Sequence, residues 1–202
     1  MSEYNTIQKR TEGLYKEKGS KFLAFAYPVA SEEQIKSIQE ELRKTYYDAR
    51  HHCYAWVLGM DNQQLRANDD GEPAHSAGDP ILGQIRSFEL TNVLVVVIRY
   101  FGGTKLGVGG LINAYKEATS AALSKAKKIE IFETRELEMR FPYDMMSTAE
   151  RLIVDCNIDV IDRDFQLACK ITGSIKKDHI EDFKAKTGDL YTMEFKITGD
   201  DQ

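Results

Sequence analysis

Between an expected strand and an expected helix lies the segment Arg99-Tyr100-Phe101-Gly102-Gly103-Thr104-Lys105-Leu106-Gly107-Val108-Gly109-Gly110-Leu111. The six apolar residues at positions 93–98 predict a buried strand. Residues 111–126 predict a helix, and the buried face that we expect for it consists of Val108, Leu111, Ile112, Tyr115, Ala118, Ala122 and Leu123. Five glycines fall within nine residues of this turn. Because glycine permits positive φ angles and close approach to the main chain, the turn is either a tight connection or a binding loop.

The charges of this turn favour a binding loop. Free N–H groups at a helix start attract anions, and Arg99 and Lys105 add two cations. The turn matches neither common nucleotide loop. A P-loop ends in Gly-Lys-Ser/Thr, whereas Leu106 follows the lysine here, and the fingerprint G-x-G-x-x-G would require glycine in place of Ile112. We therefore predict an anion site. A turn packed against its own sheet is the alternative, although such a turn does not need the two cations.

The composition is that of an ordinary globular protein. The chain has 202 residues, of which 42% are hydrophobic and 29% charged. No apolar run approaches the roughly 20 residues of a membrane span, and the first residues lack a signal-peptide pattern. We expect a cytoplasmic protein without membrane contact. Three scattered cysteines, Cys53, Cys156 and Cys169, predict reduced buried thiols rather than disulfides or a zinc site.

The net charge of −5 is unevenly distributed. Residues 1–134 carry 17 basic and 17 acidic side chains, and residues 135–202 carry 10 basic and 15 acidic ones. Neither part is a basic domain. If the chain binds nucleic acid, a local patch of the neutral first part must do so.

The second part of the chain predicts the order β-α-β-β-α-β. We expect strands over 136–143, 158–164, 166–172 and 191–197, and helices after Asp144 as N-cap and over 177–186. In the last strand we expect Tyr191, Met193, Phe195 and Ile197 to point inward. This order indicates a ferredoxin-like sandwich. The third strand has no aromatic residue and the part is acidic, so we do not expect bases to stack on this sheet.

The first part predicts mixed helices and strands. We expect strands over 22–29 and 51–58, a helix opened by the capping box Ser31-Glu32-Glu33-Gln34, and a short helix over 80–87 that Asp79 caps. A polar loop spans 68–79, and residues 126–134 are the expected linker. The predicted domains are therefore 1–130 and 135–202.

A cluster of titratable residues leaves an enzyme open as an alternative. His51 and His52 are adjacent in a strand, so they point to opposite faces and cannot easily share a metal. Asp69, Asp70 and Glu72 lie in the polar loop. With the histidines they would suit a small-molecule hydrolase or a metal-dependent enzyme. No G-x-S-x-G elbow occurs, and we expect no cofactor.

Four blocks in order resemble the YigZ/IMPACT family over residues 15–125. They are Lys18-Gly19-Ser20-Lys21-Phe22, Asp48-Ala49-Arg50-His51-His52-Cys53, Asp69-Asp70-Gly71-Glu72-Pro73, and Arg99-Tyr100-Phe101-Gly102-Gly103 with Leu106-Gly107-Val108-Gly109-Gly110-Leu111. The resemblance implies an α+β first domain like domain IV of elongation factor G and a ferredoxin-like second domain like its domain V. Asn68 and His75 depart from the family pattern, which usually has Ser and Gly there.

The resemblance also implies a role in translation. Eukaryotic relatives regulate translation by restraining a stress kinase through an added N-terminal domain, which we do not expect in this chain. We expect a non-catalytic factor that contacts RNA or a ribosome-associated protein. The predicted phosphate or RNA ligands are Arg99, Tyr100, Gly102, Gly103, Lys105, Gly107, Gly109 and Gly110. The expected groove border consists of Lys21, His51, His52, Asp69, Asp70 and Glu72.

Overall fold

The computed structural model describes residues 3–59, 64–165 and 168–198. It has a mixed α and β fold with antiparallel sheets, divided into two compact units, Glu3–Ile131 and Phe132–Gln202. Among the described residues, no helix combines the length and the apolar character that crossing a membrane requires.

A five-stranded sheet forms the centre of the first unit. Every neighbouring pair of strands is antiparallel. The strand order is β2 (Thr11–Glu17), β3 (Ser20–Pro28), β6 (Val93–Tyr100), β4 (His51–Leu58) and β5 (Gln64–Asn68). The central strand β6 is the predicted apolar run, and it is buried on both faces. Val93, Val95 and Val97 belong to one hydrophobic cluster, while the alternate residues of the run belong to another.

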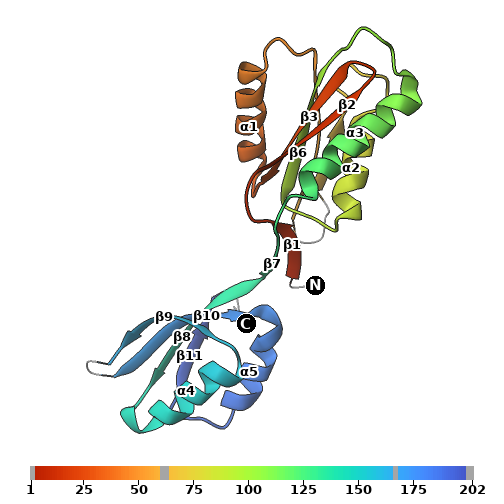
Figure 1. Ribbon diagram of the computed structural model, residues 1–202. Coiled ribbons are helices and arrows are strands. Elements are labelled where there is room, and N and C mark those ends of the chain that lie inside the picture. The colour runs from red at the N-terminus through yellow and green to blue at the C-terminus, as the bar shows by residue number, and fades with distance from the viewer. Residues whose placement is uncertain (1–2, 60–63, 166–167, 199–202) are drawn as a thin grey trace. The chain divides into compact units, whose positions relative to one another are not determined.

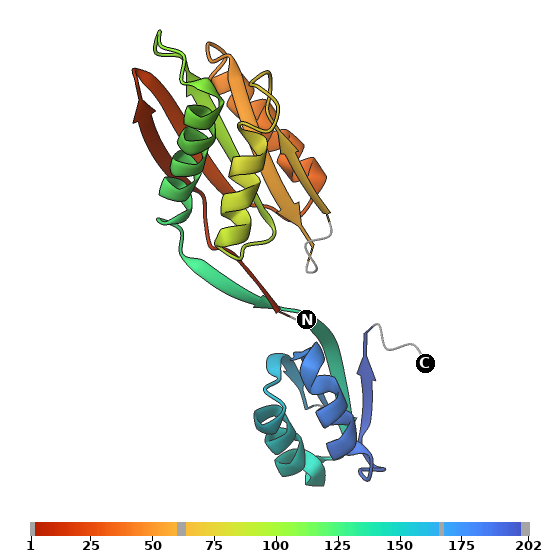
Figure 2. The same ribbon diagram turned by 90° about the vertical axis from the view of Figure 1, so that its right-hand side faces the viewer.

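Helices cover both faces of this sheet. Figure 1 shows α1 (Glu32–Thr45) on one face, and Figure 2 shows α2 (Gly78–Ser87) and α3 (Gly107–Leu123) side by side on the other. The Ser31 cap is confirmed, because the Ser31 hydroxyl accepts the N–H of Gln34 at 3.3 Å, whereas the reciprocal bond of the Gln34 side chain goes to the N–H of Ala30, one residue before the N-cap, at 2.8 Å. The face under α2 and α3 is called the α3 face below, and the opposite one the α1 face.

Several expectations for the first unit were wrong. Strand β7 (Lys128–Phe132) pairs with β1 (Glu3–Ile7) inside the expected linker. β1, β2 and β5 were not predicted because none of them contains a strong apolar alternation. Val108 and Ile112 are exposed, since only one side of α3 faces the sheet.

The second unit is a four-stranded antiparallel sheet with two helices. Its elements are β8 (Thr134–Phe141), a 3-10 turn (Tyr143–Met145), α4 (Met146–Asp155), β9 (Asp159–Asp164), β10 (Cys169–Lys176), a second 3-10 turn (Lys177–His179), α5 (Ile180–Thr187) and β11 (Glu194–Ile197). The strand order is β11-β8-β10-β9. Residues of α4 and α5 share one hydrophobic core with Leu137, Met139 and Ile171.

Three details of this unit differ from the sequence expectation. Asp144 lies inside the 3-10 turn and does not cap α4. Tyr191 is 92% exposed, because the last strand begins only at Glu194, and Phe195 is also partly exposed. Residues 166 and 167 of the expected third strand lie outside the described residues.

Each unit has its own hydrophobic core, so we predict that each folds alone. Fragments 1–131 and 132–202 should both show cooperative urea unfolding by circular dichroism, with the smaller fragment less stable because a short chain buries less of its surface. Trypsin should release two protected fragments from the intact chain. A 132–202 fragment without secondary structure would contradict the prediction.

Candidate functional site

The glycine-rich segment runs from the end of β6 into the first turn of α3. Residues 101–105 are irregular and exposed, and the helix begins at Gly107. Leu106 stands at the N-cap position and gives no side-chain cap, and the first turn contains no acidic residue. The first N–H groups of this 17-residue helix therefore lack a side-chain partner and present its positive end.

Some glycines of the segment are required by packing. A Cβ atom on Gly102 would lie 1.9 Å from the carbonyl carbon of Gly19 and 2.1 Å from the nitrogen of Ser20. The Gly102 N–H also donates to the Ser20 hydroxyl at 3.1 Å. The turn between β2 and β3 is thus pressed against the loop that follows β6. This contact explains why the first and last sequence blocks both contain glycine.

Gly109 has no such structural reason. Gly103 and Gly107 have φ angles of +89° and +72°, which other residues rarely adopt. Gly109 lies within α3 without a positive φ, and a Cβ atom placed on it would meet no described atom within 4 Å apart from its chain neighbours and the backbone of its own helix. Glycine disfavours a helix by about 1 kcal/mol relative to alanine. Glycine at position 109 therefore makes the helix locally less stable, and it leaves open space beside the start of α3.

Lys105 and two apolar residues, Val108 and Ile112, lie close to Gly109 in the sequence. Lys105 is exposed and forms no ion pair with any residue that the structure describes. Val108 and Ile112 are exposed one helical turn apart, so they are neighbours on the α3 surface. The helix start thus combines a free cation, free N–H groups and apolar contact area.

Arg99 lies elsewhere, in a buried ion pair. Its Nη1 donates to both carboxylate oxygens of Glu72, at 2.7 and 2.9 Å. The two side chains are only 7% and 4% exposed. The Tyr115 hydroxyl donates to the same carboxylate at 2.8 Å. An anion would reach Arg99 only in competition with Glu72, so this contact joins β6, the polar loop and α3.

The groups around this ion pair are neutral. The Cys53 Sγ lies 2.9 Å from the Asp69 carbonyl oxygen and 3.3 Å from the Tyr115 hydroxyl oxygen, and its single proton can be donated to one of them at a time. Burial raises the pKa of Cys53 and that of Tyr115 above their ordinary values. Both side chains remain protonated at neutral pH, and the thiol is not an activated nucleophile.

Asp69 organises the polar loop. Its carboxylate accepts the N–H groups of His75, Ala77 and Gly78, at 2.8, 2.9 and 2.8 Å. It therefore caps α2, the role that we had expected for Asp79. Burial alone would raise the pKa of Asp69, but the three backbone N–H groups outweigh it, and the pKa lies below its ordinary value.

Asp70, the third acidic residue of the cluster, is also held in place by hydrogen bonds. Asp70 accepts from Arg43 at 2.9 Å and from the His52 N–H at 2.7 Å, while its carbonyl lies 2.9 Å from Nδ1 of His51. His52 is buried, and burial lowers its pKa. Within 3–59, 64–165 and 168–198, no group of three or more His, Cys, Asp or Glu side chains is placed to hold a metal. This geometry favours a structural role for the cluster over acid–base chemistry.

We predict that Asp69→Asn destabilises the first unit by about 2 kcal/mol at pH 7, because an amide cannot accept all three N–H bonds. Trp56, the only tryptophan, lies in β4 and reports urea unfolding of this unit. The carboxylate contribution is present above the ordinary pKa of about 4 and is lost as pH falls through the lower folded pKa, so the difference should shrink as the pH is lowered below about 4. Asp79→Asn, at an exposed ion pair, is the control. Equal effects of both variants would contradict the prediction.

Two predicted site residues lie on the α1 face. Tyr100 and Lys21 line a groove of about 510 Å³, together with Leu14, Lys16, Gly19, Leu23 and Phe101. The Tyr100 hydroxyl donates to Asp48 at 2.7 Å. The sheet thus separates the predicted set: His51 and Arg99 share the α3 face, since Arg99 lies opposite His51 in register, whereas Tyr100 and Lys21 are paired on the other face.

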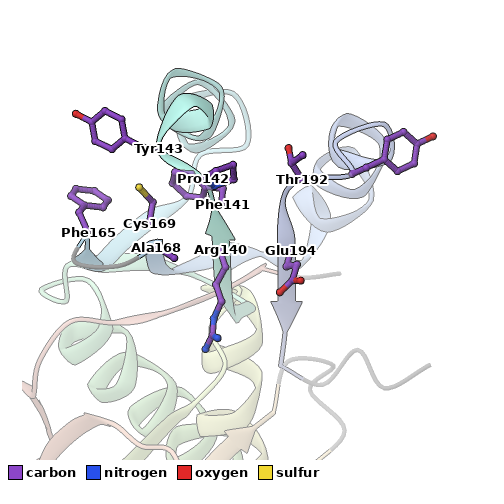
Figure 3. A pocket seen from close by; sticks show the side chains of 10 residues that line it. Arg140, Phe141, Pro142, Tyr143, Phe165, Ala168, Cys169, Thr192 and Glu194 are labelled. Atoms are coloured by element: carbon purple, nitrogen blue, oxygen red, sulfur yellow. The ribbon is translucent and has the colours of Figure 1, made fainter.

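The sequence analysis did not anticipate a larger groove in the second unit. It measures about 760 Å³ at the end of the sheet, and Tyr143 and Phe165 are two of the aromatic residues that line it (Figure 3). Arg140 lines it, but this side chain donates to Glu138 at 2.8 Å and lies opposite Glu194 in register. The groove is therefore aromatic without a free cation among these residues, and its unit is acidic.

Comparisons with known proteins agree on one relationship. Residues 18–123 match the Impact N-terminal domain. IMPACT family member YigZ from Escherichia coli is 34% identical over 175 residues, which cover 86% of each chain. Protein IMPACT homolog from Saccharomyces cerevisiae is 38% identical over 96 residues, which are 45% of this chain and 36% of that one. A crystal structure of a hypothetical protein is 29% identical over 100% of both chains, with a TM-score of 0.68.

Proposed function

This chain belongs to the IMPACT family, and on that premise we propose that it is a non-catalytic factor in the regulation of translation, which binds RNA phosphates at the start of α3. The family resemblance supports the translational role. The match to the yeast homologue covers less than half of each chain. Kinase restraint by an added domain is therefore not part of this proposal.

The two-unit organisation supports the same assignment. We infer that the second unit is ferredoxin-like, because its elements follow the order β-α-β-β-α-β with the strand order β11-β8-β10-β9. The expected likeness to domains IV and V of elongation factor G would suit a cytoplasmic factor that acts at the ribosome. A shared fold alone does not establish a function, so the site must carry the proposal.

Gly109 is the observation that carries it. A phosphate needs close access to the first N–H groups of a helix, and a side chain at this position would occupy that space. Neither packing nor backbone geometry requires glycine there. Lys105 supplies an adjacent cation. Arg99 acts in this proposal as a positioning residue, because Glu72 occupies its Nη1 and holds the end of β6 to α3.

The test compares two helix glycines that both face open space. Gly109→Ala should weaken binding of a fluorescein-labelled single-stranded RNA about tenfold, the effect of losing roughly 1.4 kcal/mol. Gly83→Ala in α2 should leave binding unchanged, although it makes the same chemical change at an exposed helix position. Both variants should be at least as stable as the parent, since alanine favours a helix.

Salt dependence and ribosome association complete the test. Lys105→Ala should reduce the slope of log affinity against log salt by about 0.7, as expected for one lost contact with a single strand. In sucrose gradients of cell extract, the protein should migrate with ribosomal particles, and the Gly109→Ala/Lys105→Ala variant should not. Absence of RNA binding would refute the phosphate site. Migration lost in this variant without any binding of isolated RNA would instead indicate a ribosome-associated protein as the partner.

A further inference from the structure

The groove on the α1 face carries an inference that rests on the proposed RNA binding. We call it the lysine–aromatic groove, defined by Leu14, Lys16, Lys21, Leu23, Tyr100 and Phe101 with Gly19 at its turn. We propose that an unpaired base of single-stranded RNA stacks in this groove, with its flanking phosphates on Lys16 and Lys21.

The groove exists because α1 covers only part of its face. The helix packs over the cluster that contains Phe25, Leu94 and Val96. The start of β3 and the end of β2 extend beyond this cluster. Leu14 in β2 is 49% exposed, and Phe101, which directly follows β6, is 56% exposed. Apolar side chains of this size are thus open to solvent beside a charged row.

The charged row favours an anionic occupant. Lys16 lies directly opposite Lys21 in the antiparallel pairing of β2 with β3, and Lys21 lies opposite Tyr100 on β6. Like charges directly opposite each other destabilise a sheet. Both lysines are exposed, and neither forms an ion pair with a described residue. A phosphate between them would relieve this repulsion.

The aromatic rings favour a base over an acidic peptide. The hydroxyl of Tyr100 is bound to Asp48, which holds its ring in place, and burial and this carboxylate raise its pKa to about 12. The Arg99 guanidinium carbon lies 5.6 Å from the centre of the Phe101 ring. Phe101 thus contacts Arg99, while more than half of its surface stays free. Aromatic side chains held in this way stack unpaired bases without sequence preference.

The groove is also within reach of the proposed phosphate site. Phe101 and Gly107 are six positions apart along the chain, so their Cα atoms are at most about 21 Å apart. One RNA strand of modest length can therefore contact both features. The volume of about 510 Å³ lies within the range of pockets that hold small organic groups.

The experiment separates base contacts from phosphate contacts. The probes are a fluorescein-labelled 12-nucleotide oligouridylate and an abasic strand of equal length. Phe101→Ala and Phe101→Leu should weaken oligouridylate binding about tenfold, within the range for one stacked base, and leave the abasic strand unaffected. Lys16→Gln/Lys21→Gln should weaken both probes and reduce the salt slope by about 1.4. Tyr47→Ala and Lys36→Gln/Lys44→Gln alter exposed residues outside the groove and should change neither.

The outcomes distinguish this proposal from the one on which it rests. If Gly109→Ala weakens oligouridylate binding and Phe101→Ala does not, the phosphate site stands and the groove assignment is overturned. If the parent protein binds neither probe, both fall. If Phe101→Leu abolishes migration with ribosomal particles at unchanged RNA affinity, the groove holds a protein and not a base. Equal urea midpoints, followed by Trp56 fluorescence, show that each variant is folded.

Discussion

Replacing Glu72 by glutamine is expected to destabilise the first unit by about 3–5 kcal/mol, because the substitution leaves the Arg99 guanidinium buried without a counter-charge. Both carboxylate oxygens are bound to Arg99, and one of them also accepts from Tyr115. The Nε of Arg99 has no hydrogen-bond partner among the described residues, so the charge depends on Glu72. Urea unfolding at pH 7, followed by Trp56 fluorescence, measures this unit without interference from the other.

A double variant separates the lost charge balance from lost packing. Arg99→Met/Glu72→Met removes both charges and keeps long apolar side chains, so it should be less destabilised than either single variant. Tyr115→Phe removes one hydrogen bond to the carboxylate and should cost about 1 kcal/mol. A Glu72→Gln variant within about 1 kcal/mol of the parent would show that the pair does not stabilise the fold. Because a change at Arg99 would also destabilise the fold, Lys105 is the residue whose substitution tests contact with RNA.

The alternation along β6 already indicated where Arg99 lies. Val93, Val95 and Val97 face α2 and α3, and the next residue of the same parity is Arg99. The continuous apolar run hides this parity, because both faces of the central strand are buried. Its partner Glu72 is 27 residues away, and a pairing over that separation follows from the sheet order and not from any local pattern.

Local patterns predicted the helices better than the edges of the sheet. The capping box at Ser31 acts within three residues, so sequence spacing alone located the start of α1. Asp69 caps α2 from eight and nine residues away, beyond the reach of such rules, and the nearer Asp79 was predicted instead. β1 and β5 are short strands held by pairing with distant segments, and their own residues show little periodicity.

Alanine substitutions of three glycines after β6 should change the stability of the first unit by different amounts, with the largest loss at Gly102 and none at Gly109. Gly102→Ala is expected to destabilise the first unit by about 3 kcal/mol or more, because its Cβ atom would overlap the backbone of Gly19 and Ser20, and neither can move as a flexible side chain would. Gly103→Ala meets no atom but keeps a positive φ, which costs roughly 1–2 kcal/mol. Gly109→Ala should be neutral or stabilising by up to about 1 kcal/mol.

Urea unfolding followed by Trp56 fluorescence ranks the stabilities of all three variants. Titration with RNA then measures the RNA affinity of each variant. Gly102→Ala acts through stability, so RNA affinity measured below its unfolding midpoint should stay near that of the parent. Gly109→Ala acts in the opposite way, with stability kept and affinity reduced. A Gly102→Ala protein as stable as the parent would mean that the β2–β3 turn is not pressed against this loop. Loss of stability at Gly109 would mean that its glycine serves the fold, and the reason for placing phosphate at the start of α3 would be removed.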